Sequence, residues 1–138
     1  MMKRIVAGTV LVAFVATPVS AQLAVSEKRW ADAEKFAVES LQYESNFEFP
    51  SGPPDLIKPA YELYGEILLA AGKPKEAAAQ FTISLKRMPN RALSLLGLAR
   101  AREVQKDAAG ANQAYRELSQ MWAGADPKVR ALLPAGKE

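Results

Sequence analysis

The chain has 138 residues, of which 49% are hydrophobic and 24% charged, and it carries a formal net charge of +3 without any histidine or cysteine. The length suits one domain, and the composition excludes wholesale disorder and a polytopic membrane protein. The lack of cysteine and histidine excludes disulfides, thiolate metal sites and the usual proton shuttles. We therefore expect no enzyme activity, no cofactor and no metal.

Residues 1–21 predict a signal peptide, because two basic residues are followed by the apolar run 5–16 and by the small residues Val19 and Ala21. Cleavage after Ala21 would leave Gln22 as the first residue. The apolar run is shorter than the ~20 residues that a membrane span needs. We expect a periplasmic or secreted bacterial protein with no stable membrane span after cleavage; the alternative is an inner-membrane protein anchored by an uncleaved signal.

Most of the net positive charge belongs to this segment, since removal of its two basic residues leaves 16 basic and 15 acidic side chains. A near-neutral chain gives no reason to expect a nucleic-acid partner. Basic residues still gather in the second half of the chain, but Glu103 and Asp107 interleave with them, and a solvated surface is the preferred interpretation for Lys86, Arg87, Arg91, Arg100 and Arg102.

Residues 22–43 predict one helix, because apolar or small residues recur at helical spacing from Glu27 to Leu41. Residues 44–58 are rich in proline and predict the only long loop.

Tyr43, Phe47 and Phe49 in and beside this loop could form an aromatic binding patch. The preferred alternative is that they fold over Tyr61 and Tyr64 as a hydrophobic lid. Trp122, near the end of the chain, is expected in the core.

Two helix pairs are predicted over residues 58–91 and 92–125, followed by a short helix and tail over 126–138. Their boundaries carry the usual signals: Gly72 ends the first helix, Pro74 opens the second, and Pro89-Asn90 separates the second from the third. Asp107 is expected to cap the fourth, and Asp126 the last helix, from Pro127 to Leu133.

An internal repeat of 34 residues relates the two pairs. A small residue allows two helices to approach closely, and an aromatic residue one turn later fills the space toward the next pair. The matching packing positions are Tyr61, Tyr64, Ala77 and Phe81 in the first pair and Leu95, Leu98, Ala111 and Tyr115 in the second.

Residues 58–91 resemble a tetratricopeptide repeat. Aligned on Pro89 as the closing proline, the signature positions hold Tyr61, Tyr64, Gly65, Leu68, Gly72, Ala77, Phe81 and Ser84. The second pair departs from the pattern at Ala99, Arg102, Lys106 and Ala123. The resemblance extends to the C-terminal portion of larger bacterial tetratricopeptide proteins of unassigned function. It implies an all-α fold: a short right-handed array of antiparallel helix pairs, about two and a half repeats long.

In such arrays the first helix of each pair lines a concave groove, so the resemblance implies a partner-binding groove of Glu62, Glu66, Leu69, Leu96, Arg100 and Glu103. The Lys and Asn clamp for a terminal carboxylate, known in the chaperone-adaptor subgroup, is absent. A Glu66–Arg100 ion pair is an equal alternative to ligand contact, worth about 0 to 1 kcal/mol. Solvated glutamates are preferred over an acid pair or cation site at Glu62 and Glu66.

The period places the first helix of an N-terminal pair at about residues 14–27, where signal cleavage would remove it. Helix 22–43 would then keep an uncovered apolar edge at Trp30, Ala37 and Leu41. The leading hypothesis is an exported interaction module whose groove binds a peptide or protein. The alternative is a structural subunit that joins copies of itself or an envelope assembly through its edges. An enzymatic hypothesis would rest on Glu62 or Glu66 alone.

Overall fold

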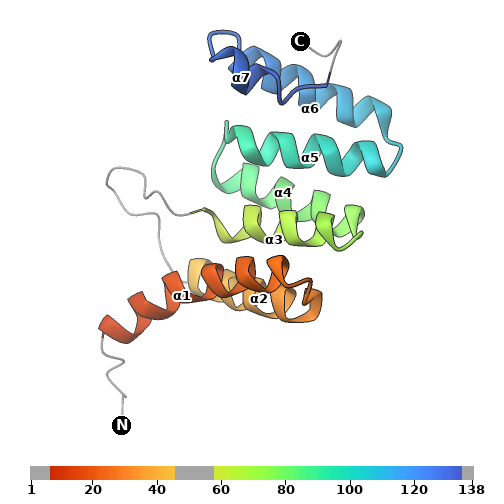
Figure 1. Cartoon of the computed structure of the whole chain (residues 1–138). Helices are drawn as coiled ribbons and strands as arrows, with labels where there is room; N and C mark the ends of the chain where they lie inside the picture. Colours follow the sequence, from red (N-terminus) through yellow and green to blue (C-terminus); the bar gives the residue numbers. More distant parts are fainter. Residues whose placement is uncertain (1–6, 46–57, 135–138) are drawn as a thin grey trace.

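The computed structural model describes residues 7–45 and 58–134. Every regular element in these ranges is a helix, so the predicted all-α class is confirmed (Figure 1). The elements in chain order are α1 Ala7–Ser26, α2 Trp30–Ser45, α3 Ala60–Ala70, α4 Pro74–Arg87, α5 Ala92–Val104, α6 Ala108–Met121 and α7 Pro127–Arg130.

The helix ends follow the expected local chemistry. Gly72 has φ +77° just after α3, a conformation that glycine adopts without a Cβ penalty. Pro74 occupies the first turn of α4, where its missing N–H costs nothing. Asp107 accepts from the Gly110 amide at 3.0 Å, and Asp126 accepts from the Lys128 amide at 2.8 Å. Both predicted caps are confirmed.

Consecutive helices from α1 to α6 pack against one another, and α3 also contacts α1 and α5. Figure 1 shows the result as a stack that runs from α1 and α2 at one end to α6 and α7 at the other. Each inner helix therefore has neighbours on both sides. Such an arrangement is typical of a helical array, in which most contacts are local in sequence.

Three clusters of buried side chains form the core. The first joins α1, α2 and α3, the second joins α3, α4 and α5, and the third joins α5 and α6 with Leu133. The structure buries the small and aromatic positions of the repeat, each at most 1% exposed: Ala77, Phe81, Ala111 and Tyr115. Tyr61 and Tyr64 are half-buried, as is Trp122, which packs on the third cluster.

At the N-terminal end, one more helix precedes the helix that was predicted from the sequence. The helix predicted from Glu27 to Leu41 corresponds to α2, and it is preceded by α1, which continues through Ala21, the residue before the predicted cleavage site. Pro18 lies inside α1 and removes one backbone hydrogen bond there. Within the described ranges, the structure contains no helix with the length and apolarity to cross a membrane.

The apolar surface that was expected to lie open on α2 is covered in the full chain. Ala37 is completely buried, in a cluster that includes Ala21 and Ala24 of α1 and Ile67 of α3. Ser40 of α2 also donates a hydrogen bond to the buried Thr17 hydroxyl of α1 at 2.9 Å.

Trp30 and Leu41 are half-buried. In the chain with α1 in place, helix α1 supplies the neighbour of this edge, so the edge at Trp30, Ala37 and Leu41 stays a prediction for the chain after cleavage.

Two predictions about the loop cannot be compared with the structure. Phe47 and Phe49, the proposed lid or binding patch, lie outside the described residues. Tyr43, at the end of α2, is half-buried.

Candidate partner-binding groove

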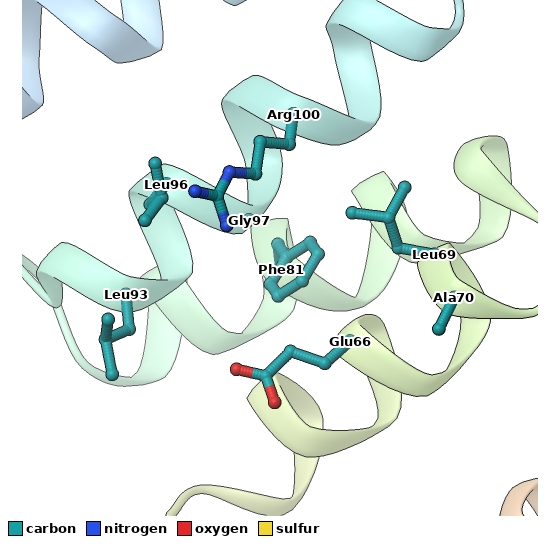
Figure 2. Close-up of a pocket in the computed structure, with 8 residues that line it drawn as sticks. All are labelled: Glu66, Leu69, Ala70, Phe81, Leu93, Leu96, Gly97 and Arg100. Atoms are coloured by element: carbon teal, nitrogen blue, oxygen red, sulfur yellow. The ribbon is translucent and has the colours of Figure 1, made fainter. Parts of the chain in front are cut away.

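A hollow of about 330 Å³ lies between α3 and α5, with α4 beneath it. Figure 2 shows Glu66 and Arg100 on opposite walls and the Phe81 ring between them. Four of the six predicted groove residues meet here. The full lining is Glu66, Leu69 and Ala70 from α3, Phe81 from α4, and Leu93, Leu96, Gly97 and Arg100 from α5.

The floor of the groove depends on two glycines that face one aromatic ring. A Cβ on Gly65 would lie 2.9 Å from the Phe81 ring, and a Cβ on Gly97 would lie 2.3 Å from it. Real Cβ atoms do not approach other atoms so closely, so the ring fits between α3 and α5 only because both positions lack a side chain. Gly65 was a predicted packing residue; the role of Gly97 was missed.

The rim of the groove is apolar as well. Leu93 is 45% exposed, and Ala70 is exposed opposite it on α3. A leucine at this exposure on a helix is ordinary by itself, but next to a hollow with a buried phenylalanine it extends a continuous apolar surface.

The two charged side chains of the groove are not paired with each other. Both Glu66 carboxylate oxygens accept from Lys58 Nζ, at 2.8 and 2.6 Å. Arg100 is exposed and has no salt-bridge or hydrogen-bond partner among residues 7–45 and 58–134. The Glu66–Arg100 pair considered from the sequence therefore does not form in the described part of the chain.

Glu62, one turn before Glu66, is 0% exposed. Arg91 Nε and Nη2 donate to its two oxygens at 2.7 and 2.9 Å, and the Ser94 hydroxyl donates to Oε2 at 2.6 Å. Ser84 Oγ in turn lies 2.9 Å from Ser94 Oγ. We call these four residues the buried polar junction. It links α3, α4 and α5, and the expectation that Glu62 is a solvated groove residue is wrong.

Only a weak signal for this junction is present in the sequence. Arg91 and Glu62 are 29 positions apart, and each has an ordinary place in a helix pattern. The available signal is that α3 is a central helix with neighbours on several sides, so few of its positions can be exposed. A glutamate near the start of such a helix needs a partner that neutralises it.

Glu103, the last predicted groove residue, faces α6 instead. It accepts a hydrogen bond from the Tyr115 hydroxyl at 3.1 Å. Burial of the phenol, followed by this bond to Glu103, raises the pKa of Tyr115 to about 12. Glu103 is thus part of the α5–α6 contact rather than of the groove.

A second carboxylate that the sequence did not single out, Glu44, joins three helix ends. It accepts from the Ala60 amide at the start of α3, where helix N–H groups lack intrahelical partners. Its Oε1 lies 3.4 Å from Arg87 Nε at the end of α4. The Arg87 guanidinium also stacks over the Tyr61 ring, 5.4 Å from its centroid.

In the described part of the chain, no cluster of three or more acidic side chains is placed to hold a metal ion. Comparisons of this chain with known protein families, with curated proteins and with solved structures find no match.

Proposed function

We propose that this chain is an exported tetratricopeptide-like interaction module that holds a peptide segment of a protein partner in the groove between α3 and α5. The observation that carries the proposal is the apolar hollow of about 330 Å³, open at an exposed leucine and floored by a buried phenylalanine. Hollows of this size and lining are typical of ligand sites. The resemblance of residues 58–91 to the tetratricopeptide family supports the same surface.

Site-specific crosslinking tests this proposal. A photoreactive amino acid replaces Leu93 at the groove or, as the matched control, Ala79, which is exposed on α4 away from the groove lining. Illumination in the cell envelope fraction should yield a partner adduct from position 93 and none from position 79. Adducts at both positions, or at 79 alone, would contradict a site between α3 and α5.

The export part of the proposal has its own consequence for α1. Ala21 is 0% exposed within that helix, whereas proteases cleave backbone that is accessible and extended. Cleavage after Ala21 must therefore precede the packing of α1 on α2. N-terminal sequencing of the native protein tests the proposal: Gln22 as the first residue supports export with cleavage, and an intact Met1 or Met2 supports a chain that retains α1.

A second candidate function is association of copies, and one observation favours it. Val19 and Leu23 are 60% and 55% exposed and lie four residues apart on one face of α1. Apolar side chains grouped in this way at the end of an array can join a second copy. Light scattering of the full chain over a wide concentration range tests this candidate. A mass that rises with concentration, and that falls in Leu23→Glu, would support it.

A further inference from the structure

The charges around the groove favour one sign of partner. Glu66 is neutralised by Lys58, and Glu62 is buried with Arg91. Glu103 faces Tyr115 on the α6 side. Arg100 is left as an exposed guanidinium without a salt-bridge partner in the described ranges, and Figure 2 shows it beside the hollow. A cation in this position attracts a carboxylate and repels another cation.

The hollow itself selects an apolar side chain. Between the charged groups of Glu66 and Arg100, its surface comes from Leu69, Leu96 and the Phe81 ring, which carry no charged atom. A cavity of ~150 Å³ already binds benzene in another protein. A volume of about 330 Å³ therefore accepts a side chain of leucine or phenylalanine size together with part of the peptide backbone.

The residues that line the groove also indicate whether the partner's carboxylate belongs to a chain terminus or to a side chain. A chain terminus is commonly captured by several backbone N–H groups in a nest. Apart from Leu93, in the first turn of α5, the lining residues lie deeper in α3, α4 and α5, where amides are bonded within their helices, so the hollow presents no nest of several free N–H groups. One arginine suits the carboxylate of a single Asp or Glu side chain.

We infer that the groove recognises an acidic peptide segment of a protein partner. A leucine- or phenylalanine-sized side chain fills the hollow over Phe81, and an Asp or Glu side chain one or two residues away pairs with Arg100. This inference rests on the proposed function and specifies the chemistry of its ligand.

Labelled peptide pools with capped ends and random flanks test it in fluorescence anisotropy with the full chain. Three pools carry a fixed central Leu-Asp, Leu-Lys or Ala-Asp, and a fourth carries Leu at a free C-terminus. The wild type should bind Leu-Asp best. Arg100→Glu should weaken Leu-Asp binding by on the order of tenfold and should bind Leu-Lys more tightly than the wild type does. Arg116→Glu, the same change at an exposed position on α6, should bind as the wild type does.

The possible results separate the inference from the function on which it rests. Equal binding of Leu-Asp and Leu-Lys, with weaker binding of Ala-Asp, would leave an apolar groove in place and overturn the acidic specificity. Preference for the free C-terminus would overturn the side-chain source of the carboxylate. Binding of no pool would overturn both the inference and the proposed groove. Circular dichroism of each variant shows that its helix content is unchanged.

Discussion

Glu62 and Glu66 lie one turn apart on α3, yet they belong to regions with opposite physical character. The Glu62 carboxylate has no exposed surface and is held by Arg91 and Ser94, whereas Glu66 lies at an open groove and is held by the flexible side chain of Lys58. The residue type and the helix are the same. The difference comes from the neighbouring segments, since the α4–α5 turn covers the first position and leaves the second exposed. Burial, rather than the number of charges, decides which carboxylate matters for stability.

The largest effect is expected at the buried polar junction. Glu62→Ala leaves the Ser94 hydroxyl and part of the Arg91 guanidinium without their acceptor, and should lower the free energy of unfolding by roughly 2–4 kcal/mol. Glu66→Ala is the matched control and should change it by less than ~1 kcal/mol. Urea denaturation followed by circular dichroism measures both. Equal losses in the two variants would show that the two positions do not differ in solvation.

The groove floor provides the next largest effect. Gly97→Ala places a methyl group against the Phe81 ring, at a cost of about 1–3 kcal/mol, while the better helix propensity of alanine returns at most ~1 kcal/mol. The net change should be destabilising. Gly124→Ala, whose Cβ would meet no atom within 4 Å, should be nearly neutral.

The double variant Gly97→Ala with Phe81→Leu tests whether the clash with the ring is the cause. The smaller leucine side chain should reduce the cost of the added methyl group. The stability losses of the two single variants should therefore sum to more than the loss in the double variant. Strict additivity in thermal or urea unfolding would mean that Gly97 and Phe81 do not share this space.

Tyr115 lies between the two extremes, with a buried ring and a hydroxyl that reaches the exposed Glu103. Its pKa is about 12 in the folded chain, above the ordinary value of ~10 in the unfolded chain. The unfolded state therefore loses this proton first, and stability should fall as pH rises from ~10 to ~12. The loss should be smaller in Tyr115→Phe, measured by urea denaturation at several alkaline pH values. Identical pH dependence in both proteins would contradict the shift.

The smallest stability effect is expected at Lys58. Lys58→Gln frees the Glu66 carboxylate at the groove and should change the free energy of unfolding by less than ~1 kcal/mol. It should nevertheless weaken binding of the Leu-Asp pool, because Glu66 then repels the acidic ligand. An unchanged affinity, measured in the same anisotropy assay, would show that Lys58 does not contribute to the charge of the groove.

Much of the fold follows from local sequence signals. Helical spacing of apolar residues predicts the long helices, and Gly72, Pro74, Asp107 and Asp126 predict their ends, because these effects act within one turn of the chain. The first helix was less predictable. The segment with the properties of a signal peptide also has the spacing of a helix that packs on α2, and Ala21 fits both roles.

The candidate groove could be predicted only in part. Glu66, Leu69, Leu96 and Arg100 meet as expected, because their positions follow from the register of α3 and α5. The burial of Glu62 depends on where Arg91 lies across a turn, and the role of Gly97 depends on a ring from α4. Contacts of this kind join residues far apart in sequence, and the periodicity of apolar residues along a helix does not predict them.

The hydrogen bond between the Glu44 carboxylate and the Ala60 amide joins the end of α2 to the start of α3. Arg87 holds the same carboxylate from α4, so the two ends of the intervening segment are fixed by groups outside it. The closure entropy between two ends that are held together depends weakly on the number of residues between them, at ~0.6 kcal/mol for each doubling. An epitope or a fluorescent reporter domain inserted between residues 45 and 58 should therefore leave the packing of α3 and α4 intact.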